Sequence, residues 1–312
     1  MRAFALRFGI LLSCALIPLA LFAYLNPPAV SNLKEIAQRA ANEYDRLLQW
    51  RMQEAFTLAA FPSLRAFAAS TPETRAERAA VALNELKALV ASDKHVREAL
   101  IVDDGGIVIM STLDGWGNSL AQRSFVQDAL NGKIAASPVA RDRAENSNYY
   151  AAPIFNNANE IAGAFVMRVD AQELWNVLPR GANWYAILSD ENGVRLGDTG
   201  DDAARLTSFG AMDGARVARL VQAQTYGAEL PFVRATQFER AQTLATQGAF
   251  DQLRAADLNA GALAYQRLLT KPWTVLALTA QPSWSVALSA LAAPALVALL
   301  LALGGALLLE RV

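Results

Sequence analysis

The segment from residue 97 to residue 170 constrains the fold of this chain more than any other part. Two short apolar runs, residues 99–102 and 107–110, flank the turn sequence Asp-Asp-Gly-Gly at residues 103–106. Apolar runs of this length on either side of a Gly-containing turn are typical of a β-hairpin. We therefore expect two antiparallel strands that begin a sheet here.

A helix and a second pair of strands are expected to follow this hairpin. Residues 120–130 place apolar side chains at helical spacing, and the Asn-Gly pair at residues 131–132 is a helix stop signal. Two further apolar runs, residues 149–155 and 161–169, are joined by a polar turn. This order predicts a small antiparallel sheet with one helix packed across it.

A shorter version of the same pattern recurs downstream. Residues 184–196 repeat the strand–turn–strand sequence, and residues 265–269 and 273–278 are expected to complete a second sheet. Between these parts, residues 211–258 are rich in Ala and Gln at helical spacing. We expect a helical connection there, and its role is open.

These patterns divide the chain into two modules and a long helix. Pro-Arg-Gly at residues 179–181 is the expected boundary between modules at residues 62–180 and 181–282. In residues 31–61, apolar side chains recur at steps of three and four until Pro62 breaks the helix. Such a helix suits a stalk beside the modules, with a second copy of the chain as a further partner. The alternative is a core helix of an unrelated fold.

Two uncharged stretches indicate a membrane protein. The hydrophobic fraction is 54%, and the mean hydropathy of +0.19 is high for a soluble protein. Residues 8–25 and 285–309 contain no charged side chain. Each stretch is long enough to cross about 30 Å of hydrocarbon at about 1.5 Å per residue, the first only just. We therefore predict two transmembrane helices.

Flanking charges give the predicted orientation. The two short ends, residues 1–7 and 310–312, carry the arginines Arg2, Arg7 and Arg311. Positive charge is retained on the cytoplasmic side of membranes, so both ends are expected in the cytoplasm. Residues 26–284 then lie outside the cytoplasm, held at the cell membrane by two passes.

The sequence contains few of the residues that enzyme active sites require. Cys14 is the only cysteine, and it lies in the first apolar stretch, where a cleaved signal peptide or lipidation is the alternative to a membrane helix. His95 is the only histidine, so catalytic triads and zinc sites lack partners. The acidic pairs at residues 103–104 and 190–191 stand in turns, where Asp is expected for backbone reasons rather than for calcium. We expect no enzyme activity, metal or cofactor, and the net charge of −1 gives no basic surface for nucleic acid.

The order of these elements resembles the ligand-binding module of the Cache family of extracytoplasmic sensors. The matching residues are Ile-Val-Asp-Asp-Gly-Gly at 101–106, Arg123-Ser-Phe125, Tyr150-Ala-Ala-Pro153-Ile, and Ile161-Ala-Gly163 before Asp170. The resemblance covers about residues 26–282, and the Pro-Trp pair at residues 272–273 resembles the membrane-proximal half of a double Cache domain. It implies an α+β fold with two PAS-like antiparallel-sheet modules on a long N-terminal stalk helix, flanked by two transmembrane helices.

The resemblance also implies a ligand pocket in the membrane-distal module. Carried over by position, its lining consists of Arg123, Phe125, Arg141, Tyr149, Tyr150 and Asp170. An arginine there would bind a carboxylate through paired charge-assisted hydrogen bonds, and an aspartate opposite would accept from an ammonium group.

Each of these residues has a structural alternative. Arg123 can face solvent or hold a loop, Phe125 can belong to the core, and Asp170 can cap a helix. Strand alternation sends Tyr149 and Tyr150 to opposite faces, and the sequence does not tell which of them faces the pocket.

A departure from the family pattern bears on the ligand class. In amino-acid-binding members, a Tyr-x-Asp pair follows a Ser-x-Pro-like stretch, whereas here Ser137-Pro138 leads to Arg141, with Asp142 displaced by one. Val126 also replaces an aromatic residue. An arginine in the place of an aspartate favours an anionic ligand group, so a small carboxylate is expected ahead of an amino acid.

These features predict a membrane-anchored sensor that binds a small molecule in its distal module and transmits the signal across the membrane. Its output requires a separate signalling partner or a C-terminal domain beyond this sequence. One alternative is an envelope structural or assembly protein that uses the fold without a ligand; another is a hydrolase with paired carboxylates. A polar, ligand-sized pocket would favour the sensor, and a filled apolar one would favour the structural protein.

Overall fold

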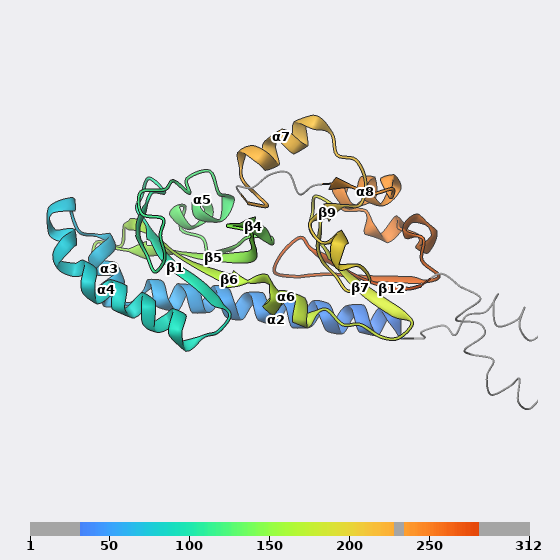
Figure 1. Ribbon diagram of the computed structural model, residues 1–312, viewed down its shortest axis with the longest axis horizontal. Helices are drawn as coiled ribbons and strands as arrows, with labels where there is room; N and C mark the ends of the chain where they lie inside the picture. Colours follow the sequence, from blue (N-terminus) through green and yellow to red (C-terminus); the bar gives the residue numbers. More distant parts are fainter. Residues whose placement is uncertain (1–31, 228–233, 281–312) are drawn as a thin grey trace, which may run out of the picture. The chain divides into compact units, whose positions relative to one another are not determined.

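The computed structural model describes residues 32–227 and 234–280 (Figure 1). The segments predicted to cross a membrane, residues 8–25 and 285–309, lie outside these ranges. Within the ranges, no helix combines the length and the apolar character that a membrane crossing requires.

The chain forms two compact units. The larger comprises residues 34–253 and 264–277 and contains most of the helices and strands. The smaller includes Arg254–Leu263, where the short 3-10 helix η3 (Ala255–Leu258) ends at a left-handed residue, Asn259, with φ of 51°.

A six-stranded antiparallel sheet follows the first helices. Its strands are β1 (Val96–Val102), β2 (Val108–Ser111), β3 (Ala135–Ala136), β4 (Ala140–Asp142), β5 (Glu145–Phe155) and β6 (Ile161–Asp170). They lie in the order β2–β1–β6–β5–β3, with β4 also paired to β5. The expected hairpin and the expected strand pair are both present, and β6 joins them by pairing with β1.

One glycine allows β6 to lie close against β1. Gly163 has a φ of 153°, and a Cβ at this position would lie 2.2 Å from the carbonyl oxygen of Val102. Any other residue would clash with the neighbouring backbone. Gly163, the last residue of the Ile-Ala-Gly motif, is therefore a requirement of the sheet itself.

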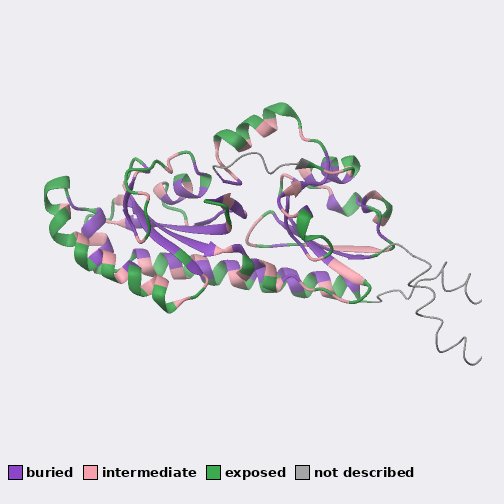
Figure 2. Ribbon diagram, viewed as in Figure 1, coloured by how far each residue is buried: buried purple, intermediate pink, exposed green. Residues whose placement is uncertain are grey.

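The helix α5 (Ser124–Leu130) covers one face of this sheet. Its apolar residues Phe125, Val126 and Ala129 are buried in a cluster with strand residues such as Leu100 and Val166. Figure 2 shows the strands as the most continuously buried part of the chain. The helical spacing seen in the sequence thus directs one stripe of α5 onto the sheet.

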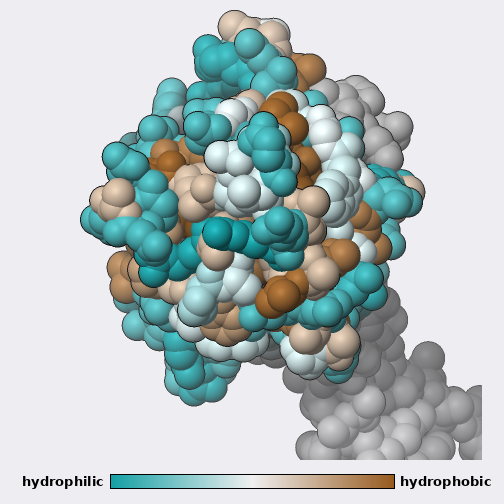
Figure 3. Space-filling model, turned by 90° about the vertical axis from the view of Figure 1, so that its left-hand side faces the viewer, coloured by the Kyte–Doolittle hydropathy of each residue, from teal (hydrophilic) through white to brown (hydrophobic). Residues whose placement is uncertain are grey.

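Among the described residues, three helices precede the sheet: α2 (Leu33–Ala59), α3 (Pro62–Ala68) and α4 (Pro72–Ser92). Pro62 is the first residue of α3, a position that tolerates proline because the first amide of a helix has no helical acceptor. Figure 3 shows the face at the α3–α4 end, where hydrophilic residues are interspersed with separate hydrophobic ones. Single exposed hydrophobic residues are ordinary on protein surfaces.

The long helix α2 contacts segments far away in the sequence. The hydroxyl of Tyr44 donates to the carbonyl oxygen of Leu174 at 2.8 Å, within α6 (Ala171–Val177). The carboxylate of Asp45 accepts from the backbone amides of Leu269 and Thr270 at 2.8 to 3.0 Å. One helix therefore contacts both α6, which follows the first sheet, and the last hairpin.

The second sheet is smaller and has the order β11–β12–β7–β8. Its strands are β7 (Trp184–Ser189), β8 (Arg195–Asp198), β11 (Leu263–Arg267) and β12 (Thr274–Thr279). Between β8 and β11 lie η1 (Asp202–Ala204), β9 (Thr207–Ser208), α7 (Gly214–Gln222), β10 (Arg234–Ala235), α8 (Glu239–Thr246) and η2 (Phe250–Gln252). In its described part, the expected helical connection contains the short α-helices α7 and α8, and β10 pairs in parallel with β9.

Arg51 joins three of the helical elements. Its side chain is fully buried and forms ion pairs with Glu54 and Asp93, each at 2.7 Å, and with Glu173. Asp93 is the C-cap of α4 and Glu173 lies in the first turn of α6. A buried guanidinium with three carboxylates therefore links α2 to both elements.

We predict that Arg51→Ala destabilises the fragment of residues 26–282 by about 3–5 kcal/mol, because it removes a fully buried guanidinium and leaves three partly buried carboxylates without this partner. Urea unfolding measures this loss. The matched control is Arg39→Ala, which removes an exposed pair with Glu35 and should cost less than about 0.5 kcal/mol. Equal effects of the two substitutions would contradict this role of Arg51.

Candidate functional site

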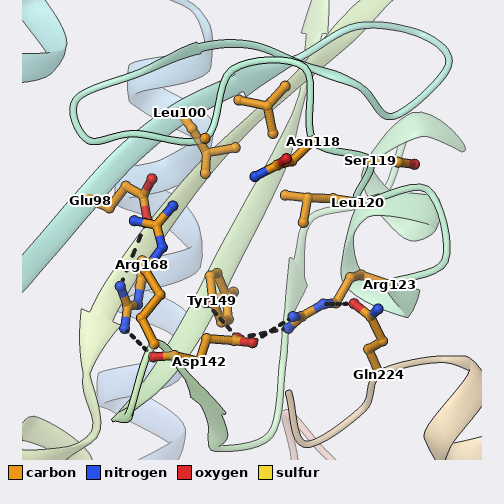
Figure 4. A pocket seen from close by; sticks show the side chains of 13 residues that line it. Glu98, Leu100, Asn118, Ser119, Leu120, Arg123, Asp142, Tyr149, Arg168 and Gln224 are labelled. Carbon is orange, nitrogen blue, oxygen red and sulfur yellow. Dashed lines mark hydrogen bonds and ion pairs between the residues drawn. The ribbon is translucent and has the colours of Figure 1, made fainter. Parts of the chain in front are cut away.

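A cavity of about 420 Å³ with charged and apolar walls lies against the first sheet and α5 (Figure 4). Its charged lining residues are Glu98, Arg123, Asp142, Arg143 and Arg168. Leu100, Val108 and Leu120 contribute an apolar wall. A few convergent polar groups in a cavity of this size are typical of small-molecule sites.

The central contact of the cavity is an ion pair between Arg123 and Asp142. Arg123 is the N-cap residue of α5 and is only 5% exposed. Its Nη1 and Nη2 donate to the two carboxylate oxygens of Asp142 at 3.0 and 2.8 Å. Two parallel charge-assisted bonds of this kind are among the strongest polar contacts in proteins.

Tyr149 completes this group of residues. Its hydroxyl donates to Asp142 Oδ2 at 2.7 Å, and its ring stacks on Phe125 with 5.0 Å between ring centroids. Burial, and then the charge of Asp142, raise the pKa of the Tyr149 hydroxyl. The group therefore stays protonated and able to donate at neutral pH.

A second charged group lies on the other side of the cavity (Figure 4). Arg168 is buried, and its nitrogens donate to Ser147 Oγ at 3.0 Å, the carbonyl oxygen of Asp142 at 2.9 Å and Glu145 at 3.1 Å. Glu98 lies 3.8 Å from Arg168 Nη1. Arg168 thus supports the backbone of the residue that binds Arg123.

Gln224 reaches the cavity from the segment that follows α7. Its Oε1 accepts from Arg123 Nε at 3.2 Å. The backbone amide of Arg141 donates to the carbonyl oxygen of Tyr226 at 2.8 Å. Gly227, with a φ of 112°, lies so close that a Cβ would be 1.9 Å from the Arg141 carbonyl oxygen. Only glycine permits this approach, which holds the segment against β4.

Tyr226 connects this segment to the hairpin of the second sheet. Its hydroxyl donates to Asp190 and accepts from Asn192 Nδ2 at 3.0 Å. Asp190 lies in the turn between β7 and β8, where burial raises the pKa of its carboxyl to about 7. A chain of contacts therefore runs from Arg123 through residues 224–226 to the second sheet.

Two of the residues expected to bind a ligand, Arg123 and Tyr149, line the cavity. Phe125 lies behind it in the hydrophobic core, because its ring stacks on the far side of Tyr149. Tyr150 is buried on the opposite face of the sheet, as strand alternation requires. Its pKa is raised by burial and then by Glu173, a residue of α6.

Asp170 and Arg141 also lie outside the cavity lining. Asp170 is the N-cap of α6, where its Oδ1 accepts from the amide of Gln172 at 2.8 Å, and it pairs with Arg97. The capping alternative is therefore the one observed. Arg141 is adjacent to Asp142 in β4, so alternation turns it away from the side on which Asp142 binds Arg123.

Several cavity residues were not identified from the sequence. Glu98 and Arg168 lie opposite each other in β1 and β6. A charged residue within a largely apolar strand is a sequence signal for a buried polar site, and both strands contain one. Asp142 was noticed only as a displaced acid. No local sequence pattern indicates Gln224, because its contact with Arg123 depends on how the segment after α7 packs against a part of the chain 101 positions earlier.

Comparisons with known proteins bear on the fold. No family model matches the sequence, and no curated protein sequence matches it. Among solved structures, the sensor domain of the V. cholerae histidine kinase DctB matches 83% of this chain and 98% of its own, with a TM-score of 0.60 and 14% identity. The chain has the fold of a double Cache sensor domain.

Other sensor structures share this double Cache fold. The ligand-binding domain of the Pseudomonas aeruginosa PAO1 amino acid chemoreceptor PctC, solved with GABA, matches 78% of this chain and 96% of its own, with a TM-score of 0.50 and 16% identity. An extracellular ligand-binding receptor from Desulfohalobium retbaense matches 81% of this chain and 41% of its own, with a TM-score of 0.50 and 11% identity. The α+β double Cache fold expected from the sequence resemblance is confirmed, whereas the stalk role of the long helix and the two transmembrane helices remain predictions.

We predict that Asp142→Asn lowers the free energy of unfolding by about 3 kcal/mol, because the buried guanidinium of Arg123 loses its charged partner. Thermal or urea unfolding of residues 26–282 measures the effect. Asp128→Asn is the control, since its partner Lys133 lies 3.8 Å away on the surface, and the expected cost is below about 0.5 kcal/mol. A loss below 1 kcal/mol for Asp142→Asn would argue against a structural role of the pair.

Proposed function

We propose that this chain is an extracytoplasmic sensor whose first module binds a small zwitterion such as an amino acid. The observation that carries the proposal is the meeting of Arg123, Asp142 and Tyr149 within one cavity. A ligand carboxylate would take the guanidinium, and a ligand ammonium would take the carboxylate and the tyrosine hydroxyl. Each charge would then exchange its present partner for one on the ligand.

This assignment revises the expected ligand class. A carboxylate was favoured over an amino acid because Arg141 was expected on the rim of the pocket. The lining contains Asp142 in its place, so that reason no longer applies. The likeness to PctC, an amino acid chemoreceptor solved with GABA, supports a ligand with both a carboxylate and an ammonium group.

The cavity also bears on the choice between a sensor and an envelope structural protein. A structural protein has no need of an open cavity of about 420 Å³ with five charged residues in its lining, whereas buried charges that converge on one space are expected of a recognition site. We further propose that residues 8–25 and 285–309 anchor the sensor in the membrane. Binding would shift the population of two states of the ectodomain, and the membrane helices would pass this shift to a signalling partner or a further domain.

The first test is a ligand screen of the fragment of residues 26–282 by thermal shift, with the proteinogenic L-amino acids and GABA as probes. A specific ligand at about 100 times its Kd adds about 2.7 kcal/mol to the stability. Removing the amino group of that ligand should weaken binding at least about tenfold, since Asp142 then lacks its partner. Equal binding of the deaminated carboxylate would contradict the zwitterion.

The second test concerns Arg123. Losing a charge-assisted pair costs about 1.5–3 kcal/mol, so Arg123→Ala should weaken binding of the identified ligand about ten- to a hundredfold. Titration calorimetry measures the change. Arg97→Ala is the control, because Arg97 pairs with Asp170 outside the cavity, and its affinity should stay within about twofold of the original. An Arg123→Ala protein that binds as well as the original would refute the assignment.

The third test concerns topology. If both ends face the cytoplasm, a reporter that is active only outside the cytoplasm should be silent when fused after Val312. The same reporter inserted in the polar turn at residues 156–159 should be active. Activity of the C-terminal fusion would overturn the two-span arrangement.

A further inference from the structure

We propose that the ligand carries a second anionic group and that Arg143 binds it, which makes an acidic amino acid the ligand class. This inference rests on the proposed function and goes beyond it by naming the side chain of the ligand. Its first support is the charge of the lining. Three arginines and two carboxylates line the cavity, and Glu145, outside the lining, pairs with Arg168. Arg123 is matched by Asp142 and Arg168 by Glu145, which leaves Arg143 with the 3.7 Å contact to Glu98. A ligand anion placed beside Arg143 would therefore meet a weakly paired cation.

Arg143 differs from the other two arginines in its contacts. Arg123 has a bidentate carboxylate partner, and Arg168 is buried with several acceptors. Arg143 is about half exposed, and its Nη1 lies 3.7 Å from Glu98, beyond hydrogen-bonding distance. Its Nη2 donates to a backbone carbonyl oxygen, that of Asp114. Its charge is therefore the one that a ligand can reach with the least rearrangement.

The backbone around Arg143 supports a role in binding. Asp142 and Glu145 are paired in the β4–β5 hairpin, and the two residues between them, Arg143 and Ala144, have φ values of 53° and 62°. Turns with two left-handed residues normally contain Asn and Gly, because other side chains are strained there. Backbone strain of this kind is concentrated at functional sites.

The strained turn has a direct consequence for the cavity. In a continuing strand, Arg143 and Asp142 would face opposite sides of the sheet. The left-handed turn breaks this alternation, so both neighbouring side chains line the same cavity. The facing loop is shaped to fit, since a Cβ on Gly115 would lie 3.1 Å from Arg143 Nη2. The turn thus brings Arg143 into the same cavity as the Arg123–Asp142 pair.

The experiment compares isosteric probes on the full 312-residue chain in detergent micelles. Titration calorimetry with L-glutamate and L-aspartate, and with L-glutamine and L-asparagine, measures the preference for a side-chain carboxylate. We expect at least tenfold tighter binding of one acidic probe than of its amide. Arg143→Gln should weaken binding of that acidic probe at least tenfold and change binding of the amide less than threefold. Arg143→Lys, which keeps the charge, should restore part of the preference.

Ala144→Gly serves as the control for the turn, since it relieves strain while keeping the guanidinium, and the preference should be retained. The inference would be overturned if Arg143→Gln bound the acidic probe as tightly as the original chain does. It would also be overturned if the original chain bound the amides more tightly than the acids. If the original chain binds other zwitterions but neither acidic probe, the inference fails and the proposed function stands. If it binds no zwitterion, both fail.

Discussion

The ion pair between Arg123 and Asp142 is the contact on which the rest of the site depends. It joins the start of α5 to the end of β4 through two hydrogen bonds of 2.8 and 3.0 Å. Because both side chains are nearly buried, each charge would be costly without the other. Tyr149 and Gln224 bind the two ends of the pair. A ligand that replaces the pair would therefore perturb the first sheet, α5 and the segment after α7 together.

Such a perturbation has physical routes toward the second sheet. Gln224 contacts Arg123, and two residues later Tyr226 is bound to Asp190 in the β7–β8 turn. The helix α2 offers another connection, since Tyr44 binds α6 and Asp45 binds the amides of the last hairpin. Transmission requires that the ligand bind one of two arrangements of these contacts more tightly than the other. The contacts of Gln224, Tyr226, Tyr44 and Asp45 are candidates for the contacts that change between the two arrangements. Their contribution is measured as the coupling free energy between ligand binding and a substitution at the contact.

Most of the fold follows from local sequence patterns, whereas the site follows from them only in part. The apolar runs at 99–102 and 107–110 encode β1 and β2, whose apolar residues are buried on both faces of the sheet. The stripe at 120–130 encodes α5, because its period sets which face of the helix is buried. Arg123 and Tyr149 were predicted through the family resemblance. Phe125 and Tyr150 were also carried over by position from the resemblance, but both are buried outside the cavity lining, because an apolar or aromatic residue fits a core position as well as a pocket wall. Gln224 stands 101 positions from Arg123, and no local pattern reports a contact at that separation.

A crystal structure of residues 26–282 with the bound ligand tests the central claim most directly. We predict that the ligand carboxylate lies within hydrogen-bonding distance of Arg123, and that the ammonium group lies equally close to Asp142 and to the hydroxyl of Tyr149. The direct bidentate contact between Arg123 and Asp142 should then be opened. A ligand bound at another place in the chain, or one in this cavity that leaves the bidentate pair intact, would contradict the claim.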